Sequence, residues 1–309
     1  MASVADKKLE GLVAATFTPF STKGNGEIEL SKIGPYIDYL TEKQGVKSIF
    51  VNGTTGESMS LTVAERKLLA EDWCKKAKGK LDQVIVHVGC MSIKDSQDLA
   101  QHAEKVEADG IAVIAPSFFK PRSADALRTY LKEVASAAPT LPFYYYHIPA
   151  VTGVNVHARD VIKGIEELIP SFRGVKFSGT DLMDFGLCST HSNSKWSMLY
   201  GVDEQLLAAL PFRADGAVGS TYNYIGRHVN KLISAFKEGD LAQAKTIQLK
   251  IQELLSYAMD KGFDVGVNKQ LMSDVSGVCL GPPRLPVMPC PRDHSEKIKK
   301  RLDELFPDC

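Results

Sequence analysis

Short apolar runs alternate with longer amphipathic segments along most of the chain. Eight of the short runs are strand candidates, at residues 12–16, 48–51, 84–88, 111–115, 143–146, 174–177, 197–200 and 216–218. Several are apolar at every position, as expected for strands of a parallel sheet that is covered on both faces. The segments between them have helical periodicity, most clearly at residues 62–78, 95–108 and 123–137.

Strand and helix repeat eight times at intervals of about 25 to 35 residues, the pattern of a (β/α)8 TIM barrel in one closed parallel sheet. The alternative is an open doubly wound sheet. We discount it because no G-x-G-x-x-G fingerprint follows the first strand, and Gly24-Asn25-Gly26 is better interpreted as a polar turn. The predicted fold class is therefore α/β, a TIM barrel.

Helical patterns continue after the last predicted strand, at residues 224–236, 241–259 and 265–273. Prolines then interrupt the pattern beyond Gly281, before a charged helical segment at 295–306. We expect a barrel core over residues 1–222, with the last barrel helix and a C-terminal helical extension over 223–309, all in one structural domain. Beyond Gly281 we expect loose organisation and assign no role.

Charge and composition exclude several classes of protein. The 309-residue chain carries 37 Lys+Arg and 37 Asp+Glu, so nothing draws it to nucleic acid or to anionic lipid. No run approaches the about 18 apolar residues of a membrane helix, and residues 1–10 lack the apolar core of a signal peptide. A cytoplasmic protein without membrane or nucleic-acid partners is expected. Six dispersed cysteines are predicted to be free thiols: Cys74, Cys90, Cys188, Cys279, Cys290 and Cys309.

Chemistry in a barrel of this kind lies at the carboxyl ends of the strands, and polar residues are concentrated there. Lys176 closes an apolar strand and should extend into the barrel mouth. Burial disfavours the charged ammonium form, so a lysine in that place can supply the neutral amine that forms a Schiff base. The alternative is that Lys176 only extends along the strand end to reach solvent.

Gly53-Thr54-Thr55-Gly56-Glu57 follows the second strand and offers two hydroxyls in a glycine-flanked turn. Backbone N–H groups can converge on a carboxylate there, although a simple turn with a threonine helix cap is the ordinary interpretation. Tyr146 ends the fifth strand, where it is either a proton relay or a core aromatic.

Asp203 and Glu204 follow the seventh strand. They are either acceptors for substrate hydroxyls or acids that stabilise a helix start. The seven histidines have no pair at metal-ligand spacing, so no metal site is predicted.

Four motifs follow one another along the chain at the ends of predicted strands: Gly53-Thr54-Thr55-Gly56-Glu57, Tyr146-His147-Ile148-Pro149, Lys176, and Gly219-Ser220-Thr221-Tyr222. With them, the chain from about Leu9 to Gly281 resembles the dihydrodipicolinate synthase / N-acetylneuraminate lyase family. The resemblance implies a homotetrameric barrel enzyme that forms a Schiff base with pyruvate or another 2-oxo acid and needs no cofactor. The family's C-terminal helical extension matches the extra helices predicted above.

The resemblance also implies roles for individual residues. Lys176 would form the imine, Tyr146 would relay the proton, and Thr54 and Thr55 would hold the 2-oxo acid carboxylate. Five further residues resemble the hydroxyl-binding set of the sialic acid lyases, namely Ser178, Gly201, Asp203, Glu204 and Ser220. The implied reaction is the reversible cleavage of N-acetylneuraminate to N-acetylmannosamine and pyruvate.

Two departures from relatives bear on this prediction. Synthases that act on aspartate semialdehyde have an arginine after the Tyr-x-x-Pro motif, whereas this chain has Pro149-Ala150-Val151-Thr152-Gly153. Many members insert a tyrosine from a neighbouring subunit, whereas this chain has Phe118 and Phe119. A lyase for another 2-keto-3-deoxy sugar acid and a 2-oxo acid binding protein without turnover remain alternatives.

Overall fold

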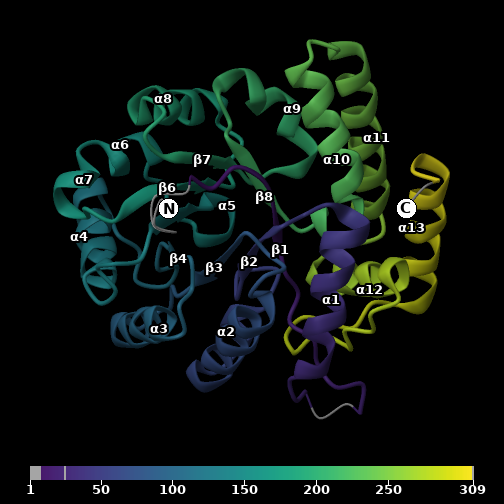
Figure 1. Cartoon of the computed structure of the whole chain (residues 1–309), viewed down its shortest axis with the longest axis horizontal. Coiled ribbons are helices and arrows are strands. Elements are labelled where there is room, and N and C mark those ends of the chain that lie inside the picture. The colour runs from purple at the N-terminus through teal and green to yellow at the C-terminus, as the bar shows by residue number, and fades with distance from the viewer. Residues whose placement is uncertain (1–7, 24–25, 308–309) are drawn as a thin grey trace.

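Eight parallel strands form a closed barrel in chain order, with β1 pairing with β8, in the computed structural model of the chain, which describes residues 8–23 and 26–307 (Figure 1). The strands are β1 Gly11–Ala15, β2 Ser48–Val51, β3 Gln83–His87, β4 Gly110–Ile114, β5 Phe143–His147, β6 Phe172–Phe177, β7 Ser197–Tyr200 and β8 Gly216–Gly219. All eight predicted strands are present with their ends within two residues. The predicted (β/α)8 barrel is confirmed.

Alternation along each strand divides the core into two layers. Tyr144 and Tyr146 of β5 point into the barrel interior, where they pack among residues such as Phe50, while Tyr145 points outward to the layer beneath the helices. Side chains two residues apart on a strand share a face, so the three consecutive tyrosines pack in both layers of the core.

The helices around the barrel follow the predicted periodicity. Those up to the last barrel helix are α1 Ile33–Tyr39, α2 Val63–Ala77, α3 Ile93–Lys105, α4 Ala124–Ala135, α5 Pro149–Thr152, α6 Ala158–Ile162, α7 Ile165–Leu168, α8 Leu182–Ser192, α9 Leu206–Ala209 and α10 Tyr222–Lys237. The start of α2 has a full capping box, in which the Thr62 hydroxyl accepts from the Glu65 N–H and the Glu65 carboxylate accepts from the Thr62 N–H.

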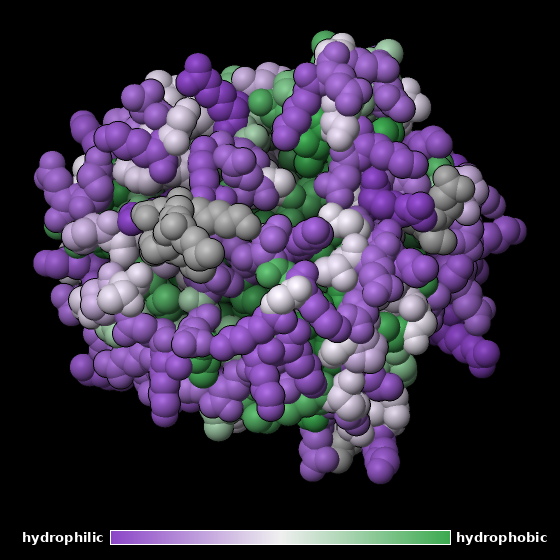
Figure 2. Space-filling view, in the orientation of Figure 1, coloured by the Kyte–Doolittle hydropathy of each residue, from purple (hydrophilic) through white to green (hydrophobic). Residues whose placement is uncertain are grey.

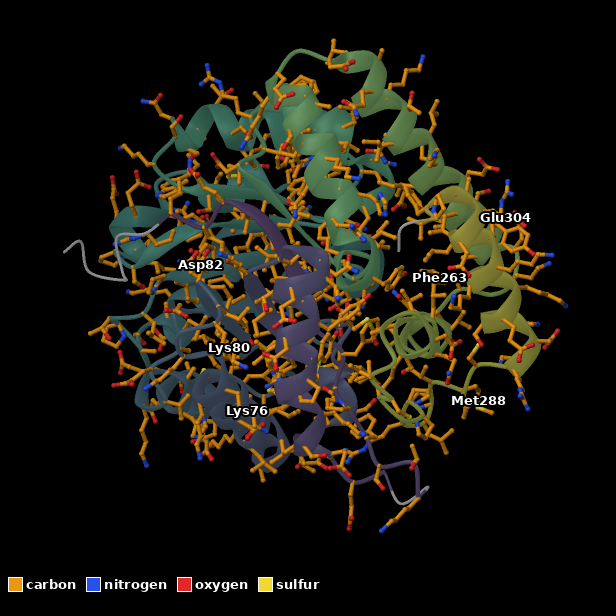
Figure 3. All side chains as sticks on the ribbon, turned by 45° about the vertical axis from the view of Figure 1, so that its right-hand side comes forward. Lys76, Lys80, Asp82, Phe263, Met288 and Glu304 are labelled. Carbon is orange, nitrogen blue, oxygen red and sulfur yellow. The ribbon has the colours of Figure 1, made fainter. Side chains whose placement is uncertain are left out.

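Three helices after α10 form the C-terminal extension: α11 Leu241–Met259, α12 Val265–Ser276 and α13 Arg292–Leu305. α11 and α12 pack on α10, and α13 packs on α11 and α12, at the side of the barrel where Phe263, Met288 and Glu304 lie (Figures 1 and 3). The predicted helical extension is therefore present.

The prediction of loose organisation beyond Gly281 is wrong. Residues 281–291 form no helix or strand, but the Arg284 guanidinium donates hydrogen bonds to Gly26 O at 3.0 Å, Ser60 O at 3.0 Å and Glu65 Oε2 at 2.9 Å. It also lies over the Phe20 ring. An arginine side chain anchors this segment to the barrel without any regular secondary structure.

Polar side chains cover most of the face shown in Figure 2, and apolar residues show in the gaps between the helices. Within residues 8–23 and 26–307, no helix is long and apolar enough to cross a membrane. Cys74, Cys90, Cys188, Cys279 and Cys290 are free thiols, as predicted. Cys309 and the predicted turn at Gly24 and Asn25 lie outside the described residues.

Candidate active site

The carboxyl ends of the strands surround a cavity of about 440 Å³, a volume typical of small-molecule sites. All nine site residues predicted from the sequence line it: Thr54, Thr55, Tyr146, Lys176, Ser178, Gly201, Asp203, Glu204 and Ser220. They come from the ends of β2, β5, β6, β7 and β8. Parallel strands bring these ends to one edge of the barrel, so residues far apart in the chain share the cavity.

Lys176 lies beside Tyr146 because β5 and β6 pair those two residues directly. The Lys176 side chain is enclosed, with 5% of the residue exposed, so the alternative in which it reaches solvent is wrong. Its Nζ lies 4.0 Å from the centre of the Tyr146 ring and 4.2 Å from that of Phe50. An amine between two aromatic faces is largely stripped of water, and the cavity leaves it accessible to a ligand.

Tyr146 contributes a hydroxyl beside the aromatic rings that surround the Lys176 amine. Its ring packs edge-on against Phe50 and His87, and its hydroxyl lies 3.2 Å from the Thr54 Oγ1, where either oxygen can donate. The fixed ring and the hydroxyl pair form a short path along which a proton can pass between β5 and the turn after β2.

Neither threonine of the turn from Gly53 to Glu57 caps a helix, since Thr62 caps α2 and the short helix Ser58–Ser60 has no side-chain cap. Instead the turn is closed by Glu57 N–H donating to Thr54 O at 3.0 Å. Among the hydrogen bonds of the described residues, none engages the N–H groups of Thr54 or Thr55. These two donors and two hydroxyls form an arrangement that suits a carboxylate.

Gly201 is required by its neighbour Ser178. A Cβ at position 201 would lie 2.1 Å from the Ser178 Oγ, so a larger residue would displace that hydroxyl. The Gly201 N–H donates to Phe177 O at 2.8 Å, which leaves its carbonyl as the group that can face a ligand.

Asp203 does not act as a helix cap. Its Oδ2 accepts from the Thr221 N–H at 3.0 Å and from the Thr221 hydroxyl at 2.6 Å, which ties β7 to the turn after β8. Burial raises the pKa of Asp203 above its ordinary value, and the bonds from Thr221 oppose that shift. Burial and the neighbouring Asp203 also raise the pKa of Glu204. Two acids with poor hydration are strong acceptors for ligand hydroxyls.

The C-terminal extension supplies one wall of the cavity, which the sequence did not predict. The Asn268 Nδ2 on α12 donates to the Ser220 Oγ at 2.8 Å, and the Asn268 Oδ1 accepts from the Tyr224 hydroxyl. The other contributions are Leu255, Met259, Phe263, Asp264 and Val265. Nothing in a helical pattern shows which way α12 packs, so only the folded structure identifies these residues.

Two buried histidines lie near the cavity and are kept neutral. Burial lowers the pKa of His147 to about 4 and holds the pKa of His87 well below its ordinary value. His147 packs on the Phe177 ring, and His87 Nδ1 is hydrogen-bonded to Asn52 O at 2.9 Å. In the described part of the chain, no three His, Cys, Asp or Glu side chains are grouped closely enough to hold a metal ion.

Comparisons with known proteins agree with the fold and the cavity. The sequence profile of the Dihydrodipicolinate synthetase family matches residues 8–305. N-acetylneuraminate lyase of Danio rerio is 60% identical over 297 residues, which are 96% of each chain.

Solved structures of sialic acid aldolases have the same fold. N-acetylneuraminate lyase (sialic acid aldolase) from Aliivibrio salmonicida superposes with a TM-score of 0.91 at 35% identity, covering 97% of this chain and 98% of that one. A sialic acid aldolase of Ruminococcus gnavus, described as a catalytic lysine mutant, has a TM-score of 0.88 at 28% identity, with 97% and 96% covered.

Proposed function

Because the chain belongs to the Dihydrodipicolinate synthetase family, we propose that it is a lyase that cleaves N-acetylneuraminate to N-acetylmannosamine and pyruvate through a Schiff base on Lys176. The observation that carries this proposal is the enclosed Lys176 amine, which opens to the cavity beside the Tyr146 phenol. A relative named N-acetylneuraminate lyase, at 60% identity over nearly the whole chain, supports the choice of substrate.

Lys176 begins the reaction by attacking the C2 ketone of the open-chain sugar acid. Loss of water gives a protonated imine, which draws in the electron pair of the C3–C4 bond as that bond breaks. The C4 hydroxyl gives up its proton and becomes the aldehyde of N-acetylmannosamine. The remaining enamine is protonated at C3 and hydrolysed, which releases pyruvate and restores the lysine.

Tyr146 is placed to take the C4 hydroxyl proton. Its hydroxyl shares a hydrogen bond with the Thr54 Oγ1, so the proton can be held between the two oxygens while the C–C bond breaks. The same turn offers the free N–H groups of Thr54 and Thr55 to the substrate carboxylate.

The far wall of the cavity fits a polyhydroxylated chain better than a second carboxylate. Asp203 is a buried acceptor and Glu204 a half-buried one, and Ser178 and Ser220 add hydroxyls. No arginine is among the residues that line the cavity in the described structure, so a second carboxylate would meet acids without a guanidinium to pair with. This favours the cleavage of a sugar acid over a reaction with aspartate semialdehyde.

We also propose that the enzyme is a homotetramer, as the family resemblance implies. Phe118 and Phe119 support association, because they are 77% and 86% exposed and pack edge-on against each other at the surface. Large apolar side chains held in water in this way are typical of interfaces. Light scattering on the purified protein should give four times the 33.8 kDa chain mass.

The test is to add pyruvate and borohydride, which reduces an imine to a stable adduct, and to map the modified peptide. A single adduct on Lys176, and loss of both the adduct and turnover in Lys176→Met, is the expected result. An adduct without cleavage of any sugar acid would favour the binding protein. Parallel assays with N-acetylneuraminate and shorter 2-keto-3-deoxy acids separate the two lyase alternatives.

A further inference from the structure

Glu57 ends the turn that carries Thr54 and Thr55, yet the proposed reaction gives its side chain no part. The Glu57 carboxylate is almost fully buried and accepts a hydrogen bond from the Lys269 Nζ at 2.9 Å. Its second oxygen accepts from the Arg284 backbone N–H at 2.8 Å. Both partners belong to the C-terminal part of the chain, more than 200 residues away, so the turn is tied to a distant segment.

Lys269 is held as firmly as its partner. Its side chain has no exposed surface, its Nζ also donates to Pro282 O at 3.3 Å, and the ammonium lies 4.1 Å from the centre of the Phe20 ring. Ionised groups of this depth occur where a specific partner compensates for the lost water. The pair therefore fixes the position of the Glu57 side chain.

The backbone of the turn needs such support. Asn52 and Glu57, which flank Thr54 and Thr55, have φ values of +59° and +56°. Residues other than glycine rarely adopt this left-handed conformation, and it persists where surrounding contacts impose it. At Glu57 the imposing contacts are the hydrogen bonds to Lys269 and Arg284.

Arg284 holds the segment that follows the turn. Its guanidinium donates to Ser60 O and to the Glu65 carboxylate, at the short helix Ser58–Ser60 and the start of α2. That contact, chiefly the hydrogen bond from Arg284, lowers the pKa of Glu65 to about 2. The backbone N–H of Arg284 thus contacts Glu57, and the Arg284 side chain contacts the residues that follow Glu57 in the chain.

Helix α12 connects this support to the opposite wall of the cavity. Asn268 donates to the Ser220 Oγ at the end of β8, while the next residue, Lys269, binds Glu57 after β2. Two consecutive residues of one helix thereby fix the spacing between the turn after β2 and the turn after β8.

We propose that Lys269 and Arg284 are positioning residues of the 2-oxo acid site. They act through Glu57, and they hold the Thr54–Thr55 donors in the geometry that binds the substrate carboxylate. This inference rests on the proposed Schiff-base function. It assigns the C-terminal extension a direct part in the affinity for pyruvate. Burial lowers the pKa of Lys269 to about 8, against the opposing effect of Glu57, so the pair is sensitive to its surroundings.

The experiment measures the condensation of pyruvate with N-acetylmannosamine by Lys269→Met, Arg284→Gln and the wild-type enzyme. The matched control is Lys67→Met, which breaks an ion pair between Lys67 and Asp98 at the surface. The N–O distance of that pair is 2.7 Å, against 2.9 Å for the pair of Lys269 and Glu57. In Lys269→Met, the KM for pyruvate should rise by about 10-fold to 100-fold, the range expected when a hydrogen bond to a charged carboxylate is lost. The kcat and the KM for N-acetylmannosamine should change by less than about threefold, because only carboxylate binding is weakened.

Arg284→Gln should raise the KM for pyruvate less, because the backbone N–H of residue 284 still reaches Glu57. The double variant Glu57→Gln with Lys269→Met leaves no unpaired buried charge and should recover part of the lost affinity.

An unchanged KM for pyruvate in a folded Lys269→Met protein would overturn the proposal. If that variant does not fold, Arg284→Gln decides, because its side chain is partly exposed. Absence of any Lys176 adduct in the wild type would instead reject the proposed function.

Discussion

Gly219→Ala should impair sugar cleavage because the added Cβ atom would overlap with the Asp203 carboxylate. Gly219 ends β8 against the Asp203 carboxylate, and an added Cβ would lie 1.9 Å from Oδ1 and 2.5 Å from Cγ. Since close-packed carbon and oxygen atoms do not approach within about 3 Å, the carboxylate has to move by about 1 Å or more.

The cost follows from what holds Asp203 in place. Thr221 donates two hydrogen bonds to Oδ2, at 3.0 Å and 2.6 Å. A hydrogen bond to a charged group contributes about 1.5–3 kcal/mol, so the loss of one corresponds to about a 10-fold to 100-fold decrease. We expect that decrease in kcat/KM for N-acetylneuraminate, because Asp203 faces the sugar chain in the proposed complex.

The assay compares kcat/KM for cleavage with trapping of pyruvate on Lys176, which should persist. Gly34→Ala is the control, since position 34 lies in α1 with nothing within 4 Å of its added Cβ, and activity there should not change. Repeating Gly219→Ala in an Asp203→Ala background should cost little more than Asp203→Ala alone. A full additional loss in that background would refute the reasoning, because the collision partner would already be absent.

Three further outcomes follow from the site. Tyr146→Phe should lower kcat by about 10²-fold to 10⁴-fold while the pyruvate adduct still forms, and an unchanged kcat would remove Tyr146 from the proton path. Asn268→Ala removes the donor to Ser220 and should raise the KM for N-acetylmannosamine by about fivefold, the equivalent of a hydrogen bond of about 1 kcal/mol; an equal rise for pyruvate would contradict this. The charged form of Lys269, which faces Glu57 and Arg284, is present below its pKa of about 8, so the KM for pyruvate should rise as the pH increases through that value. Lys269→Met should lack this rise, and a parallel rise in the variant would assign the titration to another group.

The strands and the candidate site were predictable from the sequence for a common reason. A run such as Ile111–Ile114, apolar at every position, is typical of a strand buried on both faces, and a parallel barrel brings every strand end to one edge. Residues as far apart as Thr54 and Ser220 were therefore placed in one cavity without any knowledge of distances. Thr62 and Glu65 also had the spacing of a capping box, a signal that could have excluded Thr54 and Thr55 as the helix cap.

The contribution of the C-terminal part could not be predicted in this way. Helical periodicity predicts α12 but not the direction in which Asn268 and Lys269 point relative to the barrel. Arg284 lies among prolines, where no pattern repeats, and its hydrogen bonds depend on groups from Gly26 to Glu65. Contacts between single polar side chains and distant backbone leave no periodic trace in a sequence.

The buried pair between Glu57 and Lys269 also bears on the order of events during synthesis. The two residues are 212 positions apart, and at typical translation speeds of about 5–20 residues per second roughly 10 to 40 s separate their appearance. Through this interval the Glu57 carboxylate has neither of the partners that enclose it in the finished fold, Lys269 and the Arg284 backbone. A nascent chain that stops after β8 would contain every catalytic side chain, yet its carboxylate-binding turn would have no partner to fix it. On the proposed role of Lys269, the pyruvate site becomes competent only after residue 269 has been synthesised and can pair with Glu57.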